Sequence, residues 1–156
     1  MLNPDLAALS WLVGRWTGRG RGLWSAVPGF EFVDEMSFEH DGRPLLMYHE
    51  RTLRPDGVPS HSEAGFVTAA GGGVFHWTIA EPNGITEVLV GSIVAGALEL
   101  DTTEIGHTPT TGNVSSVRRR LSPAEGGRLR AEVAIGVNGE PAVPHTESLL
   151  QRASPS

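Results

Sequence analysis

Turn-forming glycine motifs recur at short intervals along the chain, and this recurrence limits the possible folds more than any other feature of the sequence. Between the motifs, apolar residues alternate with polar ones, which is the period of a β-strand with one buried face. Consecutive strands joined by tight turns pair antiparallel, and closing such a sheet into a barrel removes both unpaired edges. The motifs are Asp41-Gly42, Pro55-Asp56-Gly57, Gly71 to Gly73, Pro82-Asn83-Gly84, Gly96, Glu125-Gly126-Gly127 and Asn138-Gly139.

These features predict an all-β fold: one domain over residues 1–153, built as an antiparallel up-and-down β-barrel of about ten strands. A short N-terminal helix is expected before the first strand, because Asn3 can cap it and Pro4 suits its first turn. Residues 154–156 are expected to form a disordered tail. The apolar residues at helical spacing are Leu2, Leu6, Leu9 and Val13.

The composition excludes several classes of partner and cofactor. The chain has 156 residues, a net charge of −6 and no cysteine, and all 12 basic residues are arginine. An acidic chain is poorly suited to a phosphate backbone, and no apolar stretch reaches the roughly 20 residues of a membrane span. The absence of cysteine excludes disulfides, thiolate zinc sites and iron–sulfur clusters. We expect a cytoplasmic monomer or weak homodimer that binds a small molecule, not nucleic acid or a membrane.

The segment Gly14–Gly22 alternates glycine or tryptophan with arginine or threonine. In a strand, Gly14, Trp16, Gly18 and Gly20 face the barrel interior, and the arginines face solvent. Inward glycines cost strand stability unless another backbone, a large side chain or a ligand comes close. The interior is therefore either a solid core or a ligand cavity, and the alternation does not decide between them. The next strand continues the pattern with Phe30, Phe32, Met36 and Phe38 on one face.

The six histidines contain no His-x-His or His-Glu-x-x-His pattern, so a zinc site with several histidines is not expected. His61-Ser62-Glu63 has the His-x-Glu spacing of zinc deaminases, but the cysteine ligands of those enzymes are missing. No nucleophile elbow or phosphate-binding loop occurs, so no catalytic residue is predicted. His49 and His76 are candidates for the distal side of a pocket, although a solvent-facing or core position is the favoured interpretation of each.

His145 is singled out by its position directly after Pro144, at the start of the last expected strand. The rigid proline fixes the backbone there, and the imidazole could face the barrel interior. A single histidine suffices for haem, whose iron needs only one axial protein ligand. His145 is therefore the candidate metal ligand of this sequence.

The longest basic run is Arg118, Arg119 and Arg120. Arg118 and Arg120 share one face of their strand and Arg119 takes the other, so at least one of them could point inward. A solvated basic strand is the favoured interpretation.

Gly14-Arg15-Trp16-Thr17-Gly18-Arg19-Gly20 matches a Gly-x-Trp-x-Gly-x-Gly motif, and together with the last strand it resembles the nitrobindin family. That family consists of haem-binding β-barrels of the fatty-acid-binding-protein and lipocalin type, similar to the C-terminal domain of THAP4, and some are proposed peroxynitrite isomerases. Further similar segments are Trp11-Leu12-Val13-Gly14 and residues 30–35, 61–66 and 82–87.

The resemblance implies one haem b per chain, in its ferric state, at an open end of the barrel. His145 is the implied axial ligand, and Gly14, Trp16, Gly18 and Gly20 are implied to shape the cofactor pocket. The implied ligands of the iron are nitric oxide and peroxynitrite, and the implied reaction converts peroxynitrite to nitrate.

Three departures from the family pattern bear on this expectation. Trp24-Ser25-Ala26 lacks a hydroxyl that relatives carry at Ala26, Gly112 replaces a lysine, and Glu147 shares a face with His145 by simple alternation. Two alternatives stay open: a non-catalytic carrier of a small apolar ligand that has lost haem, and a haem-based nitric oxide sensor without turnover.

Overall fold

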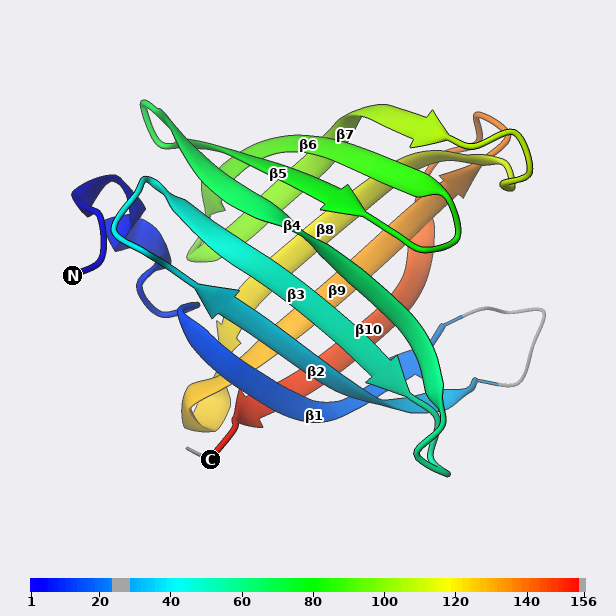
Figure 1. The fold of residues 1–156 in the computed structure, drawn as a ribbon, viewed down its shortest axis with the longest axis horizontal. Coiled ribbons are helices and arrows are strands. Elements are labelled where there is room, and N and C mark those ends of the chain that lie inside the picture. Colours follow the sequence, from blue (N-terminus) through cyan, green and yellow to red (C-terminus); the bar gives the residue numbers. More distant parts are fainter. Residues whose placement is uncertain (24–28, 155–156) are drawn as a thin grey trace.

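The computed structural model describes residues 1–23 and 29–154, whose ten antiparallel strands close into one barrel (Figure 1). The predicted all-β barrel is confirmed. In the expected tail, residues 155–156 lie outside the described residues. The strands are β1 (Gly14–Gly22), β2 (Glu31–Glu39), β3 (Leu45–Leu53), β4 (Pro59–Gly71), β5 (Val74–Ala80), β6 (Ile85–Val94), β7 (Ala97–His107), β8 (Val114–Ala124), β9 (Arg128–Val137) and β10 (Val143–Arg152).

Each strand pairs with its neighbours in sequence, and β1 pairs with β10 to close the ring. The turns lie where the glycine motifs predict them. Between β9 and β10, for example, Asn138 has a φ of 54° and Gly139 a φ of 80°, which suits the left-handed conformation that a tight hairpin turn needs. A short 3-10 helix, η2 (Glu125–Gly127), joins β8 to β9.

The leader forms a 3-10 helix, η1 (Pro4–Leu9), which lies at one end of the barrel, at the left of Figure 1. The Asn3 side chain accepts a hydrogen bond from the Asp5 N–H and caps η1 as predicted. Leu6, Leu9 and Leu12 are fully buried in the core and close this end of the barrel. No helix within residues 1–23 and 29–154 has the length and apolar character needed to cross a membrane.

The inward glycines of β1 make room for aromatic rings. A Cβ atom on Gly20 would lie 2.2 Å from the Phe32 ring, and one on Gly22 would lie 2.3 Å from the Phe30 ring. No side chain fits at such distances, so glycine is required for the rings of these two phenylalanines to lie against β1. Of the explanations for inward glycines, close approach of a large side chain applies to both positions.

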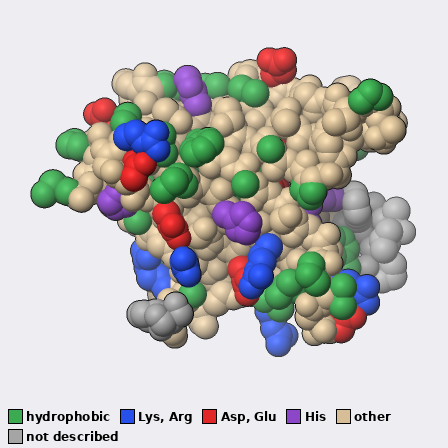
Figure 2. All heavy atoms as spheres, in the orientation of Figure 1, with side chains coloured by type: hydrophobic (Ala, Val, Ile, Leu, Met, Phe, Trp, Pro, Cys, Tyr) green, Lys and Arg blue, Asp and Glu red, His purple; other side chains and the backbone are tan. Residues whose placement is uncertain are grey.

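The outer face of the barrel carries cross-strand ion pairs. Arg15 on β1 pairs with Glu39 on β2 at 3.3 Å, and Arg51 on β3 pairs with Glu35 on β2. On the face seen in Figure 2, acidic and basic side chains lie beside one another and hydrophobic ones are scattered. Such exposed pairs contribute little stability, about 0 to 1 kcal/mol each, but they make the outer surface of the barrel polar.

Candidate functional site

The barrel contains a cavity of about 410 Å³ near the end opposite η1. Its walls are largely apolar, and its size falls within the roughly 300 to 1,000 Å³ of small-molecule sites. Solid core and ligand cavity are therefore both present, one at each end. Apolar residues of the wall include Phe30, Phe32, Met36, Val117, Val133 and Ile135.

His145 enters this cavity through a β-bulge in β10. Pro144 lies opposite Ala134 of β9 while Thr146 lies opposite Val133, so His145 is one extra residue in its strand. The bulge shifts the alternation, and His145 and Thr146 both line the cavity.

The bulge also corrects the expected position of Glu147. Simple alternation places this carboxylate beside His145, which is wrong because the extra residue moves Glu147 to the other face. Its Oε1 lies 2.5 Å from Nη2 of Arg21, and its Oε2 lies 4.0 Å from Nη1 of Arg130, both on neighbouring strands. Glu147 therefore does not share the cavity face with His145.

His145 is half-buried, and its surroundings favour the neutral imidazole. Burial lowers the pKa of His145 below its ordinary value, and the nearby His61 lowers it further. Neutral imidazole is the form that ligates a metal, so His145 is prepared for this role without first losing a proton.

The other predicted pocket residues lie farther toward η1. Trp16 belongs to the buried core, where its Nε1 donates a hydrogen bond to the Leu12 carbonyl at 2.8 Å. A Cβ on Gly14 would meet the Arg152 side chain, and one on Gly18 would meet the backbone of β10. None of these three lines the cavity. Gly20 shapes the cavity indirectly, because its missing side chain leaves room for the Phe32 ring, and Phe32 lines the cavity.

Two of the three departures from the family pattern can be located. Gly112 lies in the segment between β7 and β8, where open space surrounds it, and Glu147 lies outside the cavity as described. Ala26 and the rest of Trp24-Ser25-Ala26 lie outside the described residues.

A buried ion-pair network forms the polar side of the cavity, and Arg119 of β8 is its centre. The Arg119 guanidinium donates to Glu87 at 2.7 and 2.8 Å and to Glu63 at 2.6 and 3.0 Å. It also lies over the Trp77 ring, with 5.4 Å to the ring centroid. The favoured interpretation of a solvated basic strand is therefore wrong for Arg119. The solvated interpretation is correct for Arg118 and Arg120, which form ion pairs on the outer face of the barrel.

Tyr48 of β3 links this network to Glu50 on the same strand. Its hydroxyl oxygen lies 2.5 Å from Oε2 of Glu50 and 2.5 Å from Oε1 of Glu63. One hydroxyl has only one proton to donate, so the second short contact needs a protonated carboxyl group. Glu50 supplies it, because burial and then the charges of Glu63 and Asp34 hold the pKa of Glu50 well above its ordinary value.

Three further cavity groups have shifted pKa values. Burial raises the pKa of Asp34 to about 6, and it raises that of Glu81 to about 7 with help from the neighbouring Glu87. Burial acts in the same sense on Glu63, but Arg119 and the hydrogen bond with His61 outweigh it and hold the pKa of Glu63 well below its ordinary range.

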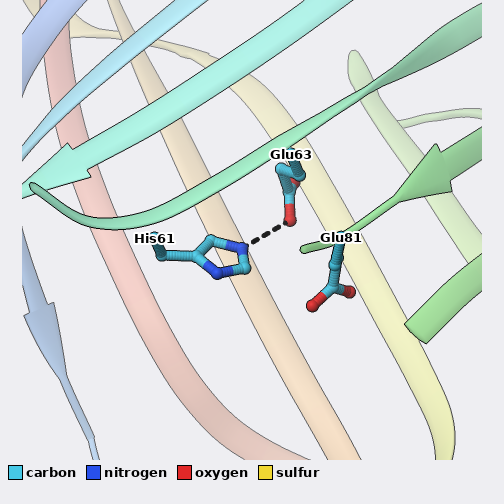
Figure 3. A group of neighbouring side chains, drawn as sticks. All are labelled: His61, Glu63 and Glu81. Atoms are coloured by element: carbon cyan, nitrogen blue, oxygen red, sulfur yellow. Dashed lines mark hydrogen bonds and ion pairs between the residues drawn. The ribbon is translucent and has the colours of Figure 1, made fainter. Parts of the chain in front are cut away.

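His61 faces the cavity from the start of β4, beside Glu63 and Glu81 (Figure 3). Its Nε2 lies 3.1 Å from Oε2 of Glu63, and this hydrogen bond raises the pKa of His61. His49 and His76, the candidates for a distal role, are exposed and do not line the cavity. The histidine that shares the cavity with His145 is therefore His61.

The sequence contained a signal for these polar residues in the alternation itself. Asp34 falls between Phe32 and Met36, and Glu63 follows His61 by two residues, so each shares a face with a cavity-lining neighbour. Buried carboxylates are rare unless they are paired. The partner that makes them possible is Arg119, which lies far away in the chain.

Comparisons with known proteins show what the chain is similar to. The family described as "THAP4-like, heme-binding beta-barrel domain" matches residues 5–152. Peroxynitrite isomerase 2 of Mycobacterium avium (strain 104) is 38% identical over 156 residues, which cover 97% of this chain and 96% of that protein. The peroxynitrite isomerase of Nocardia farcinica (strain IFM 10152) is 35% identical, with 97% and 92% covered. The crystal structure of Rv2717c from M. tuberculosis has a TM-score of 0.89 at 34% identity, covering 99% of this chain and 100% of that one.

Proposed function

The chain belongs to the family of THAP4-like, heme-binding beta-barrel domains, and on this basis we propose that it holds one ferric haem b per chain on His145 and isomerises peroxynitrite to nitrate. Nitric oxide is the second ligand that we propose for the same iron. The relatives named peroxynitrite isomerase match over nearly their whole length, which supports the same activity here.

The position of His145 carries the proposal. Haem requires an axial ligand and an apolar site that excludes water. The bulge in β10 turns His145 toward a cavity whose walls include Val117, Val133 and Ile135, and burial keeps its imidazole neutral. The residues present therefore fit the cofactor. Haem, when bound, would supply the iron chemistry for binding nitric oxide and for converting peroxynitrite to nitrate.

The protein's own contribution is to hold and shield the reacting centre. His145 would supply the nitrogen ligand to the iron. The Phe32 and Phe30 rings that pack against Gly20 and Gly22 of β1 keep part of the cavity wall apolar. The apolar wall on that side of the cavity limits the access of water to a reactive substrate. The charged outer face with its cross-strand ion pairs supports a monomer or weak homodimer.

The alternative of a fatty-acid carrier is disfavoured by Arg119. Barrels of that type hold the ligand carboxylate with a buried arginine, but here both edges of the Arg119 guanidinium are engaged by Glu63 and Glu87. The cavity also contains further carboxyl groups, including Asp34 and Glu50. An anionic head group would find no available cation among the described cavity residues.

Hemin titration tests the proposed ligand. We expect the wild-type protein to develop a Soret band with one hemin per chain and His145→Ala to lose it. His49→Ala is the matched control, because His49 is exposed on the outer face of β3 and should bind hemin normally. No Soret shift in the wild type, together with saturable binding of a fluorescent fatty acid, would favour the carrier instead.

Stopped-flow mixing with peroxynitrite separates the isomerase from a nitric oxide sensor. An isomerase accelerates peroxynitrite decay and raises the yield of nitrate, whereas a sensor binds nitric oxide and leaves both unchanged. The control is His49→Ala loaded with hemin to the same extent, which should match the wild type.

A further inference from the structure

We propose that His61, Glu63 and Glu81 bind a divalent transition-metal ion inside the cavity, separate from the iron proposed for His145. One imidazole and two carboxylates suit first-row divalent ions such as Zn²⁺ and Fe²⁺. The site lies in the same cavity as His145, and its occupation by a metal ion does not require bound haem.

The geometry of the three side chains supports the site. Their donor atoms all lie within 4.8 Å of one another, and Figure 3 shows His61, Glu63 and Glu81 gathered around a common space. Donor atoms around a tetrahedral Zn²⁺ lie about 3.4 Å apart when the bonds are near 2.1 Å. The His61 Nε2 to Glu63 Oε2 distance of 3.1 Å already meets this spacing. The Glu81 donor atom has to move closer to the other two by no more than about 1.4 Å. Glu81 is half-buried just before a turn, where Asn83 Nδ2 donates to its Oε2 at 3.0 Å.

The charge of the cavity favours a cation. Five carboxyl groups line it, whereas Arg119 is the only arginine among the lining residues that the structure describes. Buried carboxylates that lack a cation must hold a proton or repel one another. A second observation points the same way: Asp34 is 1% exposed, and its Oδ1 has no hydrogen-bond partner among the described residues. The carboxyl groups are those of Asp34, Glu50, Glu63, Glu81 and Glu87.

Arg119 positions the central ligand rather than competing with the ion. It holds Glu63 through both carboxylate oxygens and fixes the direction in which Oε2 faces His61. A bound ion would take the place of the hydrogen bond between His61 and Glu63, with neutral His61 as the nitrogen donor. The Arg119 contacts to Glu63 and Glu87 are retained. Three protein donors leave positions for water or a ligand from the cavity, as in open metal sites.

Titration with Co²⁺, a spectroscopic substitute for Zn²⁺, tests the proposal on the full, untagged chain without hemin. We expect one Co²⁺ per chain, visible d–d absorption bands and displacement by Zn²⁺. His61→Ala and Glu81→Gln should each weaken Co²⁺ binding roughly tenfold or more. Both substitutions leave the buried pairs of Arg119 with Glu63 and Glu87 in place, so the barrel should remain folded.

Two control variants separate this site from the proposed haem ligand. His145→Ala should lose hemin but keep Co²⁺, and His76→Ala, on the outer face of β5, should keep both. The proposal is overturned if the folded wild type binds no Co²⁺, if binding survives both His61→Ala and Glu81→Gln, or if it disappears in His145→Ala. Should a variant unfold, Co²⁺-loaded wild type still decides, because only a His61 ring bound directly to Co²⁺ shows the very large contact shift of a ligand imidazole. An ion held by His145 in the same cavity would shift the His61 ring protons through space alone, without that contact shift.

Discussion

The two ends of the barrel obey the same alternation of side chains but fill their interiors differently. At the η1 end, Leu6, Leu9 and Trp16 pack into a continuous apolar core. At the other end, inward positions of β4 and β8 carry Glu63 and Arg119 around a cavity. Trp77 lies between the two regions. Its ring packs edge-on against Tyr48, with 4.7 Å between the ring centroids, and the Arg119 guanidinium lies over it. Alternation thus decides which residues face inward, whereas the chemistry of those residues decides whether the interior is filled or hollow.

Removing Arg119, the cation at the centre of the buried network, should lower the stability of the cavity end more than any other substitution proposed here. Arg119→Leu leaves the carboxylates of Glu63 and Glu87 buried without a partner, and we expect a loss of about 3 to 5 kcal/mol in the free energy of unfolding. Urea denaturation measures it. The neighbouring Arg118→Leu is the control, because its exposed pair with Asp101 should contribute less than about 1 kcal/mol. Equal losses in the two variants would contradict a structural role for the buried network.

A change at the filled end should be nearly as costly but should leave the cavity intact. Leu9 is fully buried in the core beneath η1, and Leu9→Ala should cost about 3 kcal/mol through lost burial and the void it leaves. Hemin affinity of the folded variant should match the wild type. A parallel loss of hemin binding would show that the two ends are coupled rather than independent.

The pH dependence of stability should distinguish the cavity from the filled end. Burial raises the pKa of Asp34 from 3.8 to about 6. The native chain therefore holds this proton where the unfolded chain has released it, and stability falls as pH rises from about 4 to 6. A pKa rise of this size corresponds to a loss of roughly 3 kcal/mol in the free energy of unfolding across that pH range. Asp34→Asn should lack that decline, whereas the exposed control Asp101→Asn should follow the wild type. Parallel stability curves for Asp34→Asn and the wild type in urea series at several pH values would contradict the assignment.

The smallest effect is expected just outside the cavity. Glu147→Gln removes the contacts with Arg21 and Arg130 on the outer face, and it should change stability by less than about 1 kcal/mol. Hemin affinity should stay the same, because the bulge turns Glu147 away from His145. A marked change in the Soret titration would place Glu147 in the cavity after all.

How much could be predicted from the sequence differs between the two ends. The barrel, its turns, η1 and the inward position of Trp16 follow from local patterns, and each is confirmed. For Arg119 the sequence favours a solvent-facing position without excluding an inward one, because no local pattern reveals its buried partners on β4 and β6. The bulge at His145 cannot be predicted from the sequence either, because it is defined only by the pairing of β10 with β9. Local patterns predict faces, whereas long-range pairs determine where charge can be buried.

Closure of the barrel by β10 has a consequence for how the protein is made. The ladder between β1 and β10 joins strands from opposite ends of the chain, with Trp16 opposite Arg152, and such distant contacts form late and slowly. During synthesis the nascent sheet stays open until β10 leaves the ribosome, and the same strand delivers His145. Ring closure and assembly of the proposed haem site are then a single folding event. A chain stalled before Val143 would expose the unpaired edge of β1, a template for aggregation.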